Sequence, residues 1–168
     1  IATHGPELIS LAKEHGCDLC YEASVAGGIP ILRTIVNSFA ADRIIEVRGI
    51  VNGTTNYIMT QMNKNGASYA DALESAQELG FAEADPTNDV DGIDAAYKMI
   101  ILTQFAFGKD VTMDQVKVKG IRGIQKADIA EAKRLGYVIK LLGIAKLVNG
   151  HIDVSVGLAS GRPTNGVM

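Results

Sequence analysis

Apolar residues recur every three to four positions in several parts of the chain, and this spacing predicts amphipathic helices. We expect helices over residues 7–16, 31–41, 56–66, 68–80, 91–108 and 126–136. Residues that start or stop helices support several of these boundaries. Pro6 suits a first helical turn, Ser68 and Asp71 have the spacing of a capping box, and Gly80 suits a helix end.

Shorter stretches have patterns typical of strands. Residues 17–23 form a short apolar run, 43–51 alternate, 116–124 look extended, and 137–148 and 151–159 flank Asn149-Gly150, a strong hairpin signal. Helices and strands do not alternate regularly. The pattern therefore predicts an α+β fold, a mixed β-sheet with helices packed on one face. Residues 158–168 are rich in Gly, Pro and Asn, and we expect a loosely ordered tail there.

Length and composition limit the classes of function. A chain of 168 residues that is 47% hydrophobic suits a single globular domain. The net charge is −3, and the 16 Lys and Arg residues are scattered, which argues against nucleic-acid binding. No apolar run has the length of a membrane span, so we expect a soluble, cytoplasmic protein. Cys17 and Cys20 have no second Cys pair to complete a zinc site. We expect them to be residues of the strand at 17–23 without a role in metal binding or redox chemistry.

An acidic segment, residues 83–98, is the most informative part of the sequence. It holds Glu83, Asp85, Asp89, Asp91 and Asp94 and then a single lysine, Lys98. An EF-hand is excluded, because aligning Gly92 with the loop's sixth position puts Lys98 where a bidentate Glu is required.

On a helix over 91–108, Asp91, Asp94 and Lys98 share one sector with apolar residues, and the i, i+4 spacing lets Asp94 reach Lys98. In a structural interpretation, Asp91 caps the helix, the charge of Asp94 interacts favourably with the helix dipole, and Lys98 extends to solvent. Of these three roles we expect the cap at Asp91. A functional interpretation is preferred for the Asp94–Lys98 pair, since buried ion pairs stabilise proteins poorly. Such an ammonium can bind a substrate carboxylate, orient a carbonyl or donate a proton. The other carboxylates suit a substrate ammonium, which suggests an amino acid.

Two glycine-containing turns precede helices. The turn at 25–30, VAGGIP, is a tight structural turn, an anion site made of N–H groups, or a ring of carbonyls for a monovalent cation. The turn at 51–56, VNGTTN, either places Thr54 or Thr55 at an N-cap or presents backbone N–H groups to a substrate carboxylate. The sequence alone leaves these alternatives open.

Three stretches resemble the substrate-binding, catalytic domain of homoserine dehydrogenases: YEASVAGGIPILR, GIVNGTTNYI and LGFAEADPTNDVDGIDAAYKM. The likeness runs from about residue 1 to residue 148. The third stretch is the most specific, because its E-x-D-P-x-x-D-x-x-G-x-D-x-x-x-K spacing is long and rich in charged residues.

The resemblance implies a role for each matching residue. Lys98 matches the family's catalytic lysine, which handles a proton at the aldehyde or alcohol oxygen, and Asp94 matches the aspartate that binds substrate and partners that lysine. Glu83 matches the glutamate for the substrate's amino group, and Asp89 another site aspartate. The remaining implied positions are substrate contacts at Gly53, Thr54 and Phe81, which stands where the family often has tyrosine, and main-chain sodium ligands at Glu22, Val25, Gly27 and Ile29.

The resemblance also implies a reaction, reversible NAD(P)-dependent interconversion of L-aspartate 4-semialdehyde and L-homoserine on the route to threonine, methionine and isoleucine, and a homodimer. Residues 1–168 would form the catalytic and dimerisation domain, with 1–16 at the domain junction. The sequence contains no G-x-G-x-x-G, so no cofactor-binding residue is assigned, and we expect a fragment that is inactive without a Rossmann domain. The alternatives are a non-catalytic dimerisation module and a related amino-acid dehydrogenase.

Overall fold

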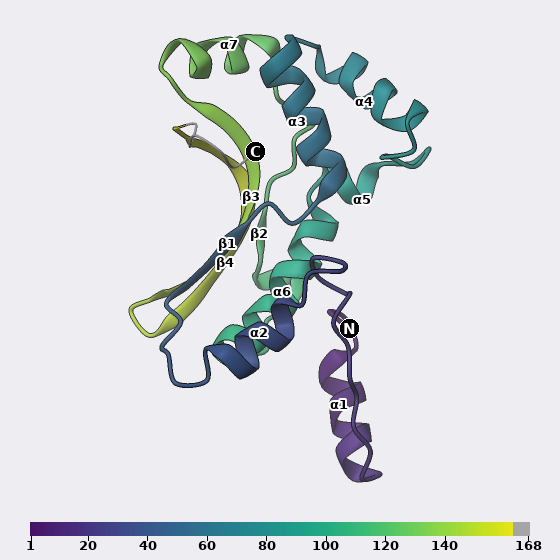
Figure 1. Ribbon diagram of the computed structural model, residues 1–168, viewed down its shortest axis with the longest axis vertical. Coiled ribbons are helices and arrows are strands. Elements are labelled where there is room, and N and C mark those ends of the chain that lie inside the picture. Colours follow the sequence, from purple (N-terminus) through teal and green to yellow (C-terminus); the bar gives the residue numbers. More distant parts are fainter. Residues whose placement is uncertain (163–168) are drawn as a thin grey trace. The chain divides into compact units, whose positions relative to one another are not determined.

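The computed structural model describes residues 1–162 of the 168. The chain forms two compact units. The first comprises Ile1–Val51, Ala96–Lys117 and Gly143–Ser155, and the second comprises Asn52–Ala95, Val118–Leu142 and the residues from Val156 on. The elements, labelled in Figure 1, are α1 (Gly5–Glu14), α2 (Ile31–Ser38), β1 (Glu46–Gly49), α3 (Gly53–Asn65), α4 (Tyr69–Glu78), α5 (Thr87–Val90), α6 (Ile93–Phe107), a 3₁₀ turn η1 (Met113–Gln115), β2 (Lys117–Val118), α7 (Lys126–Arg134), β3 (Val138–Val148) and β4 (His151–Gly161).

Four strands form one sheet in the order β1-β3-β4-β2. β1 pairs antiparallel with β3, and Glu46 lies opposite Lys146. Asn149 and Gly150 connect β3 to β4 with φ values of 50° and 85°, as the type I′ turn of a two-residue hairpin requires. The predicted hairpin and the α+β class are confirmed.

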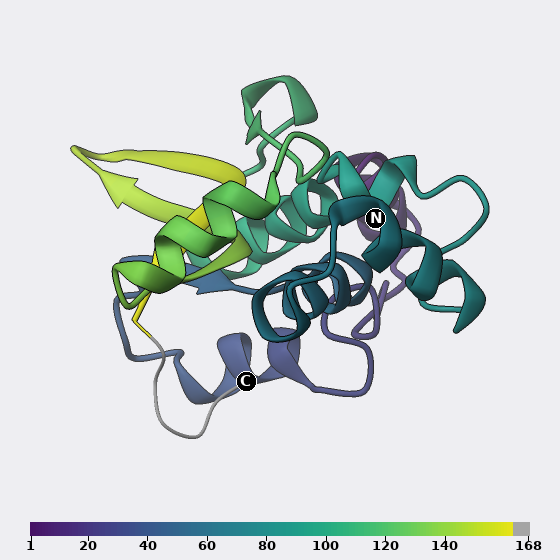
Figure 2. The same ribbon diagram turned by 90° about the horizontal axis from the view of Figure 1, so that it is seen from above.

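In the second unit, α3 is the central helix. Its Ile58, Met59 and Met62 are at most 1% exposed, as are Ala72 and Ala76 of α4, the helix that lies beside it (Figures 1 and 2). Burying each large side chain contributes about 1.5–3 kcal/mol. The predicted capping box at Ser68 and Asp71 is present and fixes the start of α4.

In the first unit, the C-terminal part of α6 packs tightly against β3. A Cβ atom at Gly143 would overlap the side chain of Met99, so glycine permits the close approach. Our expectation that the helix over 91–108 is amphipathic is wrong, because the polar Thr103 of α6 is fully buried and donates to the carbonyl of Met99. The helix is thus buried on several sides.

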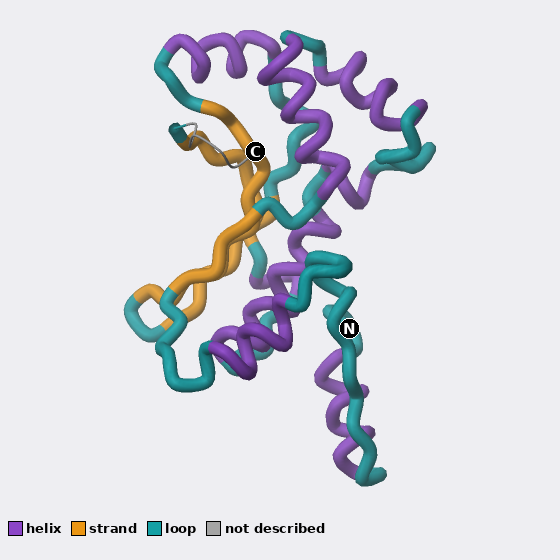
Figure 3. Tube along the Cα trace, viewed as in Figure 1, coloured by secondary structure: helices purple, strands orange, loops and turns teal. Residues whose placement is uncertain are grey.

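Two further expectations are wrong. Residues 17–23 form no strand, and the whole segment between α1 and α2 is loop (Figure 3). An apolar run becomes a strand only when a neighbouring strand satisfies its backbone, and Cys17 and Cys20 are instead exposed free thiols. β4 also continues through residues 158–161, within the expected tail, because β4 pairs with β3, the other long strand of the hairpin; residues 163–168 lie outside the described part.

The segment after β2 contacts the backbone of the acidic segment. Ile121 N–H donates to the carbonyl of Val90 at 2.7 Å, and the neighbouring Gly120 lies directly against Val90 and Asp91. A Cβ atom at Gly120 would overlap the carbonyl oxygen of Val90 and the Cα of Asp91. The absence of a side chain at residue 120 therefore sets the position of residues 90–91.

Gly120→Ala is expected to lower the free energy of unfolding by about 1–3 kcal/mol, because backbone atoms cannot move aside as a flexible side chain can. Chemical denaturation of the two proteins measures this. Gly123→Ala is the matched control, since a Cβ atom there meets nothing within 4 Å. Equal stability of the two variants would contradict the close contact.

Candidate active site

The start of α3 is built around the side chain of Asn52. The residue is the N-cap, and its Oδ1 accepts from the Thr55 N–H and from the Thr55 hydroxyl, both at 2.8 Å. The cap satisfies one of the free N–H groups of the first helical turn. Of the two alternatives that the sequence left open for this turn, an N-cap at Thr54 or Thr55 is wrong: the hydroxyls of both threonines act as donors.

The same side chain reaches two carboxylates of the acidic segment. Asn52 Nδ2 donates to Asp89 Oδ1 at 2.6 Å and to Asp94 Oδ2 at 2.8 Å. Asn52 is only 4% exposed, while both aspartates are partly exposed. The structure thus brings together three positions that lie up to 42 residues apart.

Asn52 did not emerge from the sequence as a site residue. The signal that could have found it is the turn VNGTTN itself, in which Asn52 directly follows the strand pattern, has a strong N-cap preference and offers two donor hydrogens. The sequence does not show that carboxylates come within reach of it.

Thr54 and Phe81, both expected to contact substrate, are neighbours. The Thr54 hydroxyl donates to the carbonyl of Phe81 at 2.6 Å, and the Phe81 ring lies 4.8 Å from that of Tyr57. Phe81 remains 55% exposed, so its ring is available to a ligand. Gly53, the first residue of α3, adjoins Thr54, and its own N–H lies at the helix start.

Glu83 is held through its backbone. The Gln77 side chain of α4 donates to the carbonyls of Glu83 and Ala84, at 3.1 and 3.2 Å. The residue itself is exposed. Glu83 is therefore placed by the main chain and presents its carboxylate to solvent.

Asp91 pairs with a residue outside the acidic segment. Its Oδ1 accepts from Nε of Arg122, whose Nη2 also donates to the Thr87 hydroxyl at 2.9 Å. The hydrogen bond to Asp91 raises the pKa of Arg122. Our expectation that Asp91 caps the long helix is not met: the residue ends α5 and lies two positions before α6 begins.

Lys98 lies on α6, four residues after Asp94, and is half-buried. The acidic segment therefore continues into the predicted helix, and Asp94 and Lys98 both lie on that helix. Asp94 falls in the second compact unit and Lys98 in the first.

The expected sodium ligands lie in the loop before α2. Ala26 and Gly27 both have positive φ, 60° and 56°, and the loop closes through a hydrogen bond from Val25 N–H to the carbonyl of Glu22 at 3.3 Å. The Glu22 carboxylate is used elsewhere: it accepts from the N–H groups of Leu32 and Arg33 at the start of α2. Its main-chain oxygen accepts from the Val25 N–H and has a second lone pair with which it could serve as the expected ligand.

The same loop contains a buried hydroxyl without a partner among the described residues, Ser24 Oγ. Buried polar atoms nearly always bind something, and an oxygen donor is the ligand type that a hard cation takes. The loop therefore contains oxygen atoms of the kind that bind a monovalent cation. No cluster of His, Cys, Asp and Glu side chains within residues 1–162 could hold a metal ion.

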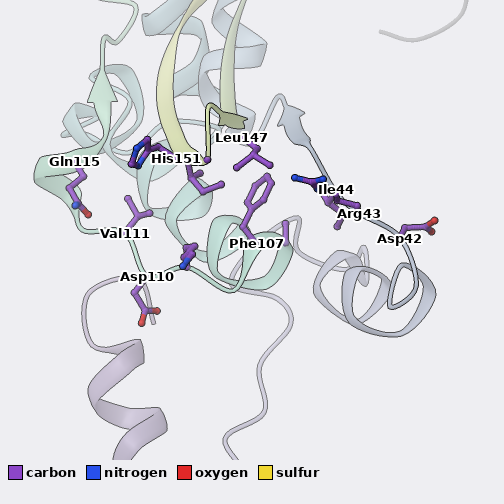
Figure 4. A pocket seen from close by; sticks show the side chains of 13 residues that line it. Asp42, Arg43, Ile44, Phe107, Asp110, Val111, Gln115, Leu147 and His151 are labelled. Carbon is purple, nitrogen blue, oxygen red and sulfur yellow. The ribbon is translucent and has the colours of Figure 1, made fainter.

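A cavity of about 590 Å³ lies elsewhere, within the first unit (Figure 4). Apolar side chains of Ile44, Phe107, Val111 and Leu147 line it, together with His151 and Gln115. None of the expected site residues contributes to its lining. No helix within the described residues is both long and apolar enough to cross a bilayer.

Comparison with known proteins identifies the class to which this fold and acidic motif belong. The family model for homoserine dehydrogenase matches residues 30–166. The homoserine dehydrogenase of Bacillus subtilis is 55% identical over 156 residues, covering 93% of this chain and 36% of the relative. That of Lactococcus lactis is 51% identical over 174 residues, covering 100% of this chain and 41% of the relative.

Solved structures agree. The crystal structure of a homoserine dehydrogenase from Thiobacillus denitrificans matches with a TM-score of 0.92 at 42% identity, covering 95% of this chain and 37% of that one. The chain belongs to the homoserine dehydrogenase family, and it spans about two fifths of the length of these relatives.

The Asp85 carboxylate accepts from the Thr87 hydroxyl and the Thr87 N–H, and these bonds lower its pKa below the model-compound value of 3.8. A carboxyl with a lowered folded-state pKa stabilises the fold above its unfolded value, and this contribution disappears as the pH falls through the folded value. We expect Asp85→Asn to be less stable than the parent at pH 7 and equally stable well below pH 3.8.

Urea denaturation at neutral and acidic pH checks this. Asp42→Asn is the control, since that exposed side chain has no hydrogen-bond partner within residues 1–162. A deficit in Asp85→Asn that persists at low pH would show that the charge is not its cause.

Proposed function

We propose that this chain is the substrate-binding, catalytic domain of an enzyme that reversibly interconverts L-aspartate 4-semialdehyde and L-homoserine with NAD(P), in the biosynthesis of threonine, methionine and isoleucine. One observation carries the proposal: in a member of the homoserine dehydrogenase family, the acidic motif places Asp94 and Lys98 one turn apart on α6, and Asp94 shares the Asn52 amide with Asp89. An aminated substrate needs anions, and a reacting carbonyl needs a cation or proton donor.

Each side chain then has a defined task. The carboxylates of Glu83, Asp89 and Asp94 bind and orient the substrate's ammonium and hydroxyl ends. We assign the Lys98 ammonium to the reacting oxygen, where it would stabilise the negative charge that develops on a carbonyl and supply the proton that makes the alcohol. In the opposite direction the same amine accepts that proton. The substrate would contact three further residues near the start of α3: Gly53, Thr54 and Phe81.

A bound nicotinamide cofactor would supply the hydride. The relatives that this chain matches are more than twice its length, and the sequence contains no dinucleotide-binding glycine pattern, so we assign NAD(P) binding to a part of the enzyme outside these 168 residues. The chain alone is then inactive. A monovalent cation such as sodium, held by main-chain oxygens of Glu22, Val25, Gly27 and Ile29, would fix the loop before α2.

We also propose that the enzyme acts as a cytoplasmic homodimer. β1 is an edge strand of the sheet, and the flanking Ile45 and Ile50 are 62% and 45% exposed, which supports association with a second copy. Assembly alone, without substrate binding, is the competing function.

Binding of homoserine separates the two functions. We expect L-homoserine to raise the melting temperature of the chain, because a ligand that binds only the folded state stabilises it by about 2.7 kcal/mol at one hundred times its Kd. 4-Hydroxybutyrate, which lacks the amino group, should have little effect. No shift with homoserine at any accessible concentration would favour the assembly function.

Lys98→Ala in the full-length enzyme tests the chemistry. Loss of a positioned proton donor typically costs 10²–10⁴-fold, so we expect kcat to fall by about that range while KM changes little. Steady-state kinetics in both directions measure this. Turnover close to that of the parent would remove Lys98 from the mechanism.

A further inference from the structure

We propose that Asn52 is a positioning residue of this site: its carboxamide holds Asp89 and Asp94 in one fixed orientation, so that the substrate meets two anions whose geometry is set before it binds. The claim that Asn52 orients the two aspartates rests on the hydrogen bonds alone. The claim that this orientation matters for catalysis rests on the proposed function.

The orientation of the Asn52 amide is determined by its partners. Oδ1 accepts from two groups of Thr55, the N–H and the hydroxyl, at 2.8 Å each. The N–H can only donate, so it requires the oxygen on that side. The nitrogen must then face Asp89 and Asp94, and the amide cannot flip without losing the bond from the Thr55 N–H and both bonds to the carboxylates.

The hydrogen-bonding capacity of the Asn52 amide is also fully used. A carboxamide offers two donor hydrogens and an oxygen with two acceptor positions, and all of these are used. At 4% exposure, water has little access to replace any of them. A buried polar group with every position filled is rigid, because any rotation leaves unpaired groups.

The two carboxylates are thereby brought close. Both bonded oxygens lie within hydrogen-bond distance of one nitrogen, which puts them within about 5 Å of each other. Two like charges at that separation repel, and the shared N–H groups offset the repulsion. The amide engages one oxygen of each carboxylate, Asp89 Oδ1 and Asp94 Oδ2, and so fixes the direction in which each carboxylate points.

The N-cap position extends this control to α3. The N-terminus of the helix carries partial positive charge, and Asn52 connects it to the carboxylates. One residue therefore links the helix start that bears Gly53 and Thr54 with the two aspartates. A capping residue without further duty would need only an acceptor oxygen, whereas Asn52 also uses both of its donor hydrogens.

A residue exchange tests the structural part without any substrate. Asn52→Asp keeps the cap oxygen but turns the donor into a third carboxylate, so we expect a clear loss of thermal stability. Adding Asp89→Asn restores an amide–carboxylate pair with the partners exchanged, and should recover a substantial part of the loss.

Asp91→Asn added to Asn52→Asp is the matched control, because it removes a nearby charge that pairs with Arg122 instead. We expect it to recover less in a double-mutant cycle. Equal recovery by both second changes, or no recovery by Asp89→Asn, would overturn the positioning role.

Kinetics of the full-length enzyme test the consequence. Asn52→Ser keeps a capping oxygen without adding charge, and we expect KM for homoserine to rise at least tenfold, with a smaller change in kcat. Asn63→Asp is the control on the same helix, since that side chain donates to the carbonyls of Met59 and Ile139 and has no hydrogen bond to a carboxylate within residues 1–162.

The outcomes are separable. If Asn52→Ser has the parent's KM while the exchange behaves as expected, Asn52 orders the aspartates but not for substrate, and the positioning role in catalysis is wrong. If the parent enzyme does not act on homoserine, the proposed function fails, while the exchange experiment still decides whether Asn52 holds the two carboxylates.

Discussion

A single buried carboxamide, that of Asn52, links the two features on which this structure's chemistry depends. It caps α3 with its oxygen and binds two aspartates with its nitrogen. Because a buried donor or acceptor costs free energy when it is left unpaired, all of these bonds have to form together. The helix start and the acidic segment are therefore ordered as one piece.

The rest of the second unit supports this arrangement through α3. At the far end of the helix, Asn63 donates to the carbonyl of Ile139 on β3, and the Lys140 ammonium donates to Asn56 and Thr60 at 2.9 and 2.8 Å. Burial lowers the pKa of Lys140, with a smaller contribution from Lys64. These polar contacts fix α3 against the strand, while its apolar side chains pack on α4.

Close backbone contact places the acidic segment from the other side. Gly120 lies against Val90 and Asp91, and Arg122 then reaches Asp91 and Thr87. A short segment after β2 thus supplies both the steric limit and the countercharge. The motif is rich in carboxylates that repel one another, and such partners keep it in one conformation.

The sequence by itself determined six of the seven α-helices within residues 1–162, the hairpin, the α+β class and the family, because helix caps, the Asn-Gly turn and the spacing of the acidic motif are local properties. The short helix α5 was not predicted. The strand expected at 17–23 failed, since a strand depends on a partner that no local pattern supplies. The choice of Asn52 over Thr54 and Thr55 as N-cap was likewise decided only by the tertiary structure. Asn52 is the N-cap because its amide can also donate to Asp89 and Asp94. These two aspartates come from a segment distant in sequence, so only the tertiary structure brings them to the start of α3.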